Sequence, residues 1–501
     1  MKLTPGDAHD QELLAQAYPG DWVNPTPDGR YNLVAIGGGT AGLVAAVGAA
    51  GLGAKVALVE RRLLGGDCLN FGCVPSKAFL RGAHAAHAVT LAGDFGYATA
   101  ARGAIDFAAV MERMRKLRSQ ISHHDSAARL KSLGVDVFLG EARFISPTSL
   151  EVDAARLEFR RAVVATGTRP VEPNVPGLAE LGYLTNETVF ALAERPRTLI
   201  VLGAGPIGCE LAQAFGRLGS EVHLVNDVDR LLPKEDPSAA EVVRQTLADE
   251  GIHLHLGWTA QRAERLGAGK SLVIARGSQQ EVLIGDEILV AIGRRPVVDG
   301  LALPAAEVQV NDGGVIVNDF LQTTNRRIYA AGDVCTPVRF THAADAMSRL
   351  VLQNALFMGR KRFSKLNIPR TTFTDPQLAH VGLTPAEAER QHVAIDSYRV
   401  ELADVDRAIL DGETAGFGVV HTRKGSGRIV GGTIVAAQAG EMIGELTLAL
   451  DRKLSLSHLA GTIHCYPTQV EVLKHIADQY QRTRLTPRVA RLFQTWLAWR
   501  R

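Results

Sequence analysis

The chain has 501 residues, of which 46% are apolar and 22% are charged. This length corresponds to about three domains of ordinary size. The composition excludes a disordered chain, a collagen-like repeat and a small disulfide scaffold. Lysine and arginine total 55 against 53 aspartate and glutamate, and the resulting net charge of +2 predicts no nucleic-acid partner.

The cysteine count and the N-terminal residues indicate in which cellular compartment the protein is found. Five cysteines are too few, and odd in number, for a secreted disulfide framework. Residues 1–22 contain acidic side chains and lack the basic start and apolar run of a signal peptide. The charge-free stretch at 31–54 contains seven glycines, which disfavours a membrane-spanning helix. We therefore expect a cytoplasmic protein.

A strand, a glycine-rich turn, a helix and a second strand follow one another near the start of the chain. The apolar run at 31–36 predicts a buried strand, and Gly-Gly-Gly-Thr-Ala-Gly follows at 37–42. Small apolar residues at 43–53 predict a helix, and residues 55–59 predict the next strand. This order is the context that the dinucleotide fingerprint requires.

Each residue of this fingerprint has a physical role. Gly37 makes the tight turn, Gly39 lets the backbone approach a pyrophosphate, and Gly42 lets helix and strand pack closely. The free N–H groups at the helix start then face the phosphates. Glu60 lies 23 residues after Gly37, where a carboxylate is expected to accept hydrogen bonds from an adenosine ribose.

The same strand, glycine-rich turn, helix and strand motif occurs a second time later in the chain. A predicted strand at 198–202 leads into Gly-Ala-Gly-Pro-Ile-Gly at 203–208, and a second strand at 221–225 ends at Asn226. Asn226 again lies 23 residues after the first glycine. Two copies with correct flanking strands predict two Rossmann-like dinucleotide-binding domains, which suggests a flavin enzyme that takes hydride from a nicotinamide.

The residue after the second strand bears on which nicotinamide is used. A carboxylate there favours NADH, and an arginine nearby accommodates the 2′-phosphate of NADPH. Asn226 is neither, whereas Asp227 follows it and Arg230 lies close by in sequence. The pattern leans slightly toward NADH and leaves NADPH open.

A pair of cysteines lies between the two fingerprints, in GGDCLNFGCVPSK at 65–77. This segment resembles the active-site sequence of the flavin-dependent pyridine nucleotide–disulfide oxidoreductases, the group that contains glutathione reductase, dihydrolipoamide dehydrogenase and mercuric reductase. The resemblance extends from about residue 31 to 480. It rests further on VVATGTRP at 163–170, VAIGRRP at 290–296, RIYAAGDV at 327–334 and FTDPQLAHVGLT at 373–384.

The resemblance implies roles for the redox segment. Cys73 is expected to be the thiolate next to the flavin, and Cys68 the interchange thiol that attacks the acceptor. Lys77 is expected to pair with Glu210, beside the flavin and the nicotinamide. A zinc site at Cys68 and Cys73 is excluded because no second Cys/His pair at ligand spacing exists, and a static disulfide is disfavoured in a cytosolic chain.

The resemblance also implies FAD, and NADH or NADPH, as cofactors, with Asp333 holding the ribityl–phosphate region. The other residues expected to contact FAD or the nicotinamide dinucleotide are Gly37, Gly39, Thr40, Ala41, Gly42, Glu60, Arg61, Gly66, Asp67, Lys77, Thr166, Gly167, Gly203, Gly205, Pro206, Ile207, Gly208, Asn226, Gly293 and Gly332. Cys209 and Cys335 are interpreted as structural.

The C-terminal motif departs from the disulfide-reducing members. These have a catalytic histidine followed five residues later by glutamate, whereas this chain has Tyr466 at the histidine position and keeps Glu471. Histidine moves protons near neutral pH and tyrosine mostly does not, and losing a matched acid–base group costs about 10²–10⁴ in rate. If the segment is extended, His464 lies on the same side as Tyr466 and substitutes for the missing base. An equally weighted alternative is that His464 makes only a packing hydrogen bond.

Mercuric reductase also has tyrosine at this position. Hg(II) prefers thiolate ligands, so Cys68 and Cys73 would be its ligands, and Tyr466 would help to hold or discharge the ion. The chain lacks the N-terminal metal-binding domain and the C-terminal cysteine pair of that enzyme, with no cysteine after Cys465. The acceptor is thus Hg(II) or a disulfide. The alternatives are a quinone or diaphorase-type reductase, a dihydrolipoamide dehydrogenase-like reductase, and a non-enzymatic subunit.

The chain is predicted to be α/β, with two Rossmann-like dinucleotide-binding domains and an α+β C-terminal dimerisation domain. The expected divisions are an N-terminal extension at 1–30, the first part of the FAD-binding domain at 31–180, the NAD(P)-binding domain at 181–300, the return of the FAD-binding or central domain at 301–365, the dimerisation domain at 366–480 and a basic amphipathic tail at 481–501. A homodimer is expected, because in the family the segment around Tyr466 completes the partner's active site. The tail is interpreted as a helix closing over its own subunit or the partner. Docking on a membrane or another protein is the less favoured alternative.

Overall fold

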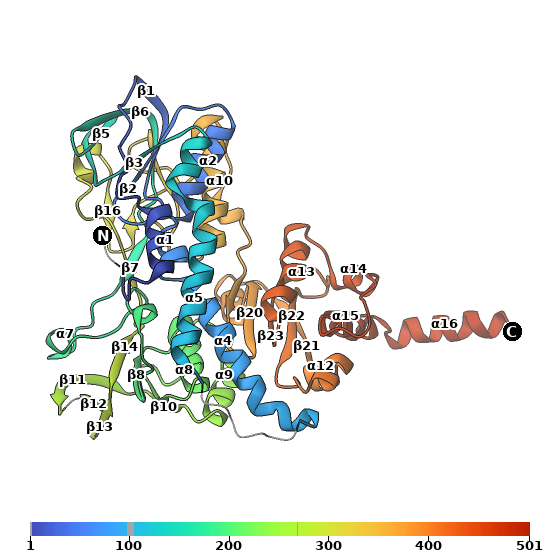
Figure 1. Ribbon diagram of the computed structural model, residues 1–501. Helices are drawn as coiled ribbons and strands as arrows, with labels where there is room; N and C mark the ends of the chain where they lie inside the picture. Colours follow the sequence, from blue (N-terminus) through green and yellow to red (C-terminus); the bar gives the residue numbers. More distant parts are fainter. Residues whose placement is uncertain (1–2, 98–104, 268) are drawn as a thin grey trace. The chain divides into compact units, whose positions relative to one another are not determined.

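The computed structural model describes residues 3–97, 105–267 and 269–501, and its chain divides into two compact units. The first unit comprises Met1–Gly203, Ala214–Asp227 and Trp258–Leu366, and the second comprises Ala204–Gln213, Val228–Gly257 and Asn367–Arg501 (Figure 1).

A seven-stranded sheet is the centre of the first unit. Its strands run in the order β3-β2-β1-β6-β5-β4, and β18 pairs with β6. Their bounds are β1 (Arg30–Ile36), β2 (Val56–Glu60), β3 (Val135–Leu139), β4 (Ala142–Ser146), β5 (Ser149–Val152), β6 (Ala155–Val164) and β18 (Ile328–Ala330). Alternate residues of β1 enter opposite cores, with Leu33 and Ala35 in one and Val34 and Ile36 in the other. Both faces are therefore buried, as the unbroken apolar run of the strand predicts.

Helices cover the sheet where the first fingerprint ends. α2 (Thr40–Gly51) packs on α10 (Thr341–Leu356), and the Ser348 hydroxyl donates a 2.8 Å hydrogen bond to the carbonyl of Ala41 (Figure 1). The predicted strand–helix–strand order is confirmed. The other helices of this unit are α3 (Gly66–Asn70), α4 (Cys73–Leu91), α5 (Phe107–Ser122), α6 (Ala127–Ser132) and α7 (Leu178–Leu181).

The N-terminal segment is part of the first core rather than a loose extension. Leu13 and Ala17 of α1 (Ala8–Ala17) are fully buried. The Arg118 guanidinium lies 2.6 Å from the Asp10 carboxylate and also donates to the carbonyl of Asn70 at 3.0 Å. This buried ion pair ties α1 to α5 and to the end of α3.

The second fingerprint has the same strand arrangement as the first. β8 (Thr198–Leu202) pairs in parallel with β9 (Glu221–Asn226) and with β14 (Glu287–Val290), and α8 (Pro206–Arg217) follows the glycines. An antiparallel meander is formed by β11 (Thr259–Leu266), β12 (Gly269–Arg276) and β13 (Gln279–Gly285), and the short β7 (Thr168–Pro170) pairs with β15 (Arg294–Pro296). The predicted α/β class, with two strand–turn–helix–strand units, is confirmed.

The second unit is built on a five-stranded antiparallel sheet in the order β19-β20-β23-β22-β21. The strands are β19 (Arg370–Thr372), β20 (Gln377–Gly382), β21 (Ile395–Glu401), β22 (Phe417–Arg423) and β23 (Ile429–Ala436). The helices are α9 (Pro237–Asp249), α11 (Pro385–Arg390), α12 (Asp406–Asp411), α13 (Ala439–Asp451), α14 (Leu456–Ala460), α15 (Glu471–Arg484) and α16 (Pro487–Trp499). Apolar side chains of α13, α14 and α15 fill the core against this sheet.

The C-terminal tail forms α16, which continues beyond α15 (Figure 1). No residue of α16 is buried, so the expected packing over its own subunit is not observed in the part of the chain that the structure describes. None of the described helices is both long and apolar enough to cross a bilayer.

Candidate functional site

Both fingerprints place their first glycine in the same strained turn. Gly37 has φ +108°, and a Cβ there would lie 2.4 Å from the carbonyl oxygen of Ala165. Gly203 has φ +101°, and a Cβ there would lie 2.6 Å from the carbonyl oxygen of Ala291. In each copy the glycine N–H donates a 2.8 Å hydrogen bond to the neighbouring strand. Only glycine fits either turn.

The start of α2 is shaped for a phosphate group. A Cβ on Gly42 would lie 1.8 Å from the carbonyl oxygen of Gly37, so helix and turn are in backbone contact. Gly39 precedes the helix and no side chain caps it, which leaves the first-turn N–H groups for an anion. These features fit the pyrophosphate of a dinucleotide.

Glu60 is held by the backbone of this turn. Its two carboxylate oxygens accept hydrogen bonds from the N–H groups of Gly38 at 2.5 Å and Arg62 at 2.6 Å. Burial raises the pKa of the Glu60 carboxyl, against the opposing effect of these two donors. Each oxygen retains a further acceptor site, so the predicted bond to an adenosine ribose stays a prediction.

The redox segment lies directly against the first fingerprint. The N–H of Gly65 donates to the carbonyl of Gly38 at 2.8 Å, and a Cβ on Gly66 would lie 2.5 Å from the Cα of Gly39. The fold thus brings α3, which carries Cys68, to the phosphate-binding turn.

The two thiols of this segment differ in acidity. Cys73 opens α4 and is exposed, and its sulfur lies 3.3 Å from the hydroxyl oxygen of Thr341. A hydrogen bond from the Cys68 thiol lowers the pKa of Cys73 to about 6, and Thr341 and the charge of Lys77 act in the same direction. The pKa of Cys68 is raised, first because its thiol donates to Cys73 and then by burial. Near neutral pH the pair therefore holds one thiolate and one thiol.

Arg294 connects the redox segment to the expected flavin contacts. Its guanidinium lies 3.0 Å from the Asp67 carboxylate and donates to the side-chain oxygens of Thr168 at 2.8 Å and Asn186 at 3.0 Å. Thr168 in turn donates to the Asp333 carboxylate at 3.0 Å. Burial raises the pKa of the Asp333 carboxyl.

Four residues of this site were not predicted from the sequence. One is Thr168, in the motif at 163–170, where only Thr166 and Gly167 were predicted. Arg294 lies within the motif at 290–296, where only Gly293 was singled out, so a signal was present. Asn186 and Thr341 lie in no motif that we identified, and they reach the redox segment from 119 and 268 residues away.

The other predicted FAD contacts lie around the same turns. Thr40 and Ala41 open α2, Arg61 follows β2, Thr166 and Gly167 connect β6 to β7, and Gly332 follows β18. Together with the turn at Gly37 and the exposed Cys73, these residues fit a bound flavin dinucleotide.

The predicted nicotinamide contacts occupy the second copy. Pro206, Ile207 and Gly208 open α8 after Gly205, and Asn226 ends β9. Glu210 accepts a 2.8 Å hydrogen bond from the N–H of Phe373. The pairing of Glu210 with Lys77 stays a prediction.

The structure separates the environments of His464 and Tyr466. The His464 side chain is 5% exposed and its Nε2 lies 3.0 Å from the Glu445 carboxylate. Tyr466 is 71% exposed and its hydroxyl donates to Asp406 at 2.9 Å, a bond that raises the tyrosine pKa. The two side chains therefore have different partners within this subunit, and the replacement of the missing base by His464 stays a prediction. Glu471 begins α15 and accepts from the N–H of Thr468 at 3.3 Å.

The remaining cysteines have different surroundings. Cys209 is fully buried and donates to the carbonyl of Ala204 at 3.4 Å, and burial raises its pKa. Burial also raises the pKa of Cys335 to about 12. These environments fit the structural roles expected for both. Cys465 is exposed.

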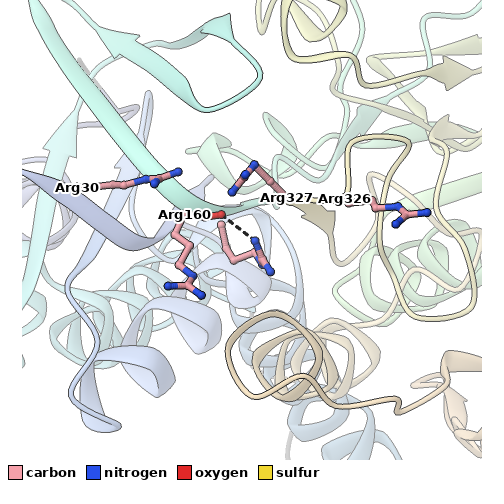
Figure 2. Close-up of a pocket in the computed structure, with 5 residues that line it drawn as sticks. Arg30, Arg160, Arg326 and Arg327 are labelled. Carbon is pink, nitrogen blue, oxygen red and sulfur yellow. Dashed lines mark hydrogen bonds between the residues drawn. The ribbon is translucent and has the colours of Figure 1, made fainter.

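A pocket of about 370 Å³ in the first unit is lined by Arg30, Arg160, Arg161, Arg326 and Arg327 (Figure 2). It lies where β1 and β18 begin, whereas the fingerprint turn lies where β1 ends. Figure 2 shows Arg326 directed away from the other labelled side chains. The pocket is therefore separate from the dinucleotide site.

Comparison with known proteins agrees with this geometry. Residues 31–348 match the family model for pyridine nucleotide-disulphide oxidoreductases, and residues 368–477 match its dimerisation domain. The chain is 36% identical to mercuric reductase of Staphylococcus aureus, over 89% of this chain and 82% of that protein. It is 33% identical to dihydrolipoyl dehydrogenase of Bacillus subtilis, over 88% and 95% respectively.

A solved structure shows the same fold. The Cu(II) complex of the HOCl-induced flavoprotein disulfide reductase RclA from Escherichia coli superposes with a TM-score of 0.79 at 28% identity, covering 88% of this chain and 98% of that one. The dimerisation-domain match supports a homodimer, and family members use FAD and NAD(P)H. With paired dinucleotide turns, a dithiol beside one of them and both family domains, this chain belongs to the class I flavin-dependent pyridine nucleotide–disulfide oxidoreductases.

Proposed function

We propose that this flavoprotein oxidoreductase binds a soft metal ion such as Hg(II) between Cys68 and Cys73 and reduces it with electrons from NAD(P)H. The observation that carries the proposal is the exposed Cys73 at the start of α4, with the Thr341 hydroxyl 3.3 Å from its sulfur and the Cys68 thiol as a neighbour that lowers its pKa. Soft ions prefer such ligands. The 36% identity to a mercuric reductase supports the choice of ion.

The residues would act in a defined order. The Cys73 thiolate binds the ion first, and binding to the second sulfur displaces the proton of Cys68, because a metal competes with protons for thiolates. FAD, when bound, supplies two-electron transfer from the nicotinamide. The sum is NAD(P)H plus Hg(II) giving NAD(P)⁺, a proton and Hg(0), so the ion itself calls for no imidazole base.

The surrounding residues would position the reactants. We infer that Lys77 and Glu210 pair beside the flavin and the nicotinamide, and that the segment at 464–471 of each subunit completes the other subunit's site. Tyr466, which is exposed, would hold or discharge the ion. The reaction would take place in the cytoplasm.

A disulfide is the second candidate acceptor, supported by the 33% identity to a dihydrolipoyl dehydrogenase. With tyrosine at position 466, and with His464 bonded to Glu445 within its own subunit, the proton transfer of that reaction lacks its usual group. A quinone is the third candidate, and it would not require the dithiol.

The test is anaerobic reduction of the purified flavoprotein with NADH and NADPH, followed by Hg(II) in excess thiol. We expect a long-wavelength absorbance band of a thiolate against the flavin, and then sustained nicotinamide oxidation that yields volatile Hg(0). Cys68→Ser should abolish metal reduction and leave quinone reduction largely intact. Cys209→Ala, which changes a buried cysteine with a structural role, is the control.

The outcomes separate the candidates. Absence of the band would contradict the contact between Cys73 and the flavin. A band without turnover on Hg(II) would overturn the choice of acceptor and leave small disulfides and quinones to be screened. Retention of metal reduction by Cys68→Ser would show that the dithiol does not bind the ion.

A further inference from the structure

The strongest unexplained surface of the molecule is the apolar face of α16. Its large side chains include Leu492 at 66% exposure, Phe493 at 53%, Trp496 at 52% and Leu497 at 59%. The helix has a regular N-cap, since the side chain of Thr486 accepts a hydrogen bond from the N–H of Val489. A formed helix with this much exposed apolar surface marks an interaction site.

The apolar residues lie on one side of the helix. Val489, Leu492 and Trp496 are spaced three and four residues apart, and Leu497 lies five residues after Leu492, which is the spacing of one broad helix face. Arg488 and Arg491 lie three residues apart in α16 and form a basic flank beside that face.

The preceding helix, α15, has a similar apolar face, and in α15 this face is buried. In α15, Val472, Leu473, Ile476 and Ala477 recur at the same intervals, and all four are fully buried in the core of the second unit. In α16 the corresponding face contacts no core in the part of the chain that the structure describes. The partner of α16 is therefore something other than the fold of its own subunit.

The charge of this region favours an anionic partner. Residues 479–501 contain six arginines and no aspartate or glutamate, whereas the whole chain has a net charge of only +2, so the remaining residues carry −4. Pairing α16 with the same helix of a second copy would bring these like charges together. An anionic phospholipid surface instead complements both the apolar face and the arginines.

We propose that α16 docks the protein on an anionic phospholipid surface, with the helix lying in the plane of the headgroups. Its 13 residues are too few to span a bilayer. Trp496 and Trp499, which have amphipathic rings suited to the membrane–water interface, are 52% and 77% exposed. The arginine flank would contact the phosphates.

The test uses the full-length flavin-loaded protein and vesicles of phosphatidylcholine, with or without an equal share of phosphatidylglycerol. We expect flotation only with the anionic vesicles, release by high salt, and a blue shift of tryptophan fluorescence on binding. The double variant Leu492→Glu/Trp496→Glu should lose at least tenfold in vesicle binding. Leu52→Glu, at an exposed leucine of the first unit (61%), is the matched control and should bind as the unaltered protein does.

Folding and oligomeric state are measured in parallel on the same variants. Flavin content and NAD(P)H-dependent quinone reduction should not change in the double variant, because α16 contributes no residue to the dinucleotide site. Failure of the unaltered protein to float with anionic vesicles overturns the proposal. So does dissociation of the homodimer by the double variant without any vesicle binding, since α16 would then be a contact between subunits.

Discussion

The sulfur of Cys73 lies 3.3 Å from the hydroxyl oxygen of Thr341, a residue 268 positions later in the chain. A hydroxyl that donates to a thiolate stabilises the charged form and lowers the thiol pKa. Thr341 opens α10, so this contact depends on the packing of α10 beside α2 and not on any local sequence pattern.

Thr341→Val should raise the pKa of Cys73 from about 6 by roughly half to one unit, because a hydrogen bond contributes about 1 kcal/mol and one pKa unit is 1.36 kcal/mol. Because the pKa is raised, Cys73 becomes protonated at a higher pH as the pH is lowered, and the thiolate predominates only above the new pKa. Alkylation of Cys73 measured against pH by mass spectrometry gives both curves. Thr341→Ser should keep the original profile, and coincident profiles for Val and Ser would exclude this role of the hydroxyl.

Gly42→Ala should prevent flavin binding and destabilise the first unit by about 3 kcal/mol or more, since the new Cβ would meet the carbonyl oxygen of Gly37 at 1.8 Å. The ratio of flavin to protein absorbance and the urea midpoint measure the two effects. Gly51→Ala lies in the same helix with no atom within 4 Å of its Cβ, so it should be neutral or slightly stabilising. Equal behaviour of the two variants would contradict the close contact of helix and turn.

Asp10→Asn should destabilise the protein by about 3–5 kcal/mol, because it leaves the Arg118 guanidinium buried without its charged partner. The double variant Asp10→Leu/Arg118→Met should recover most of the loss. Arg349→Met removes an exposed pair with Asp345 and should cost less than about 0.5 kcal/mol. Chemical unfolding monitored by circular dichroism distinguishes the three, and an Asp10→Asn cost as small as that of Arg349→Met would show that α1 contributes little.

Arg294→Lys should weaken flavin binding about tenfold or more, almost as much as Arg294→Met. A lysine presents one point charge and cannot reach Asp67, Thr168 and Asn186 at once, whereas the guanidinium does so with separate nitrogen atoms. Flavin dissociation constants from fluorescence titration provide the measurement. Arg295→Met, at the next position of β15, should bind flavin normally, and full function of Arg294→Lys would show that charge alone suffices.

The turns and the cysteine pair of this protein could be predicted from local sequence. Glycines at 37, 42 and 203 are required by turns too tight for a side chain, and the cysteines at 68 and 73 are set by a short local segment. Such features depend on neighbours in the chain, so the composition and spacing of a few residues are enough to predict them. The α/β class follows in the same way from strands that flank each turn.

Which distant residues complete the site, and which surfaces are covered, depends on tertiary packing and could not be predicted from local sequence. Thr341 and Asn186 reach the redox segment only through packing, and His464 proved to be bonded to Glu445 while Tyr466 is exposed. The helices α15 and α16 have the same apolar periodicity, yet only α15 is buried. A local pattern fixes which side chains share a helix face, but burial depends on whether the rest of the fold presents a surface to that face.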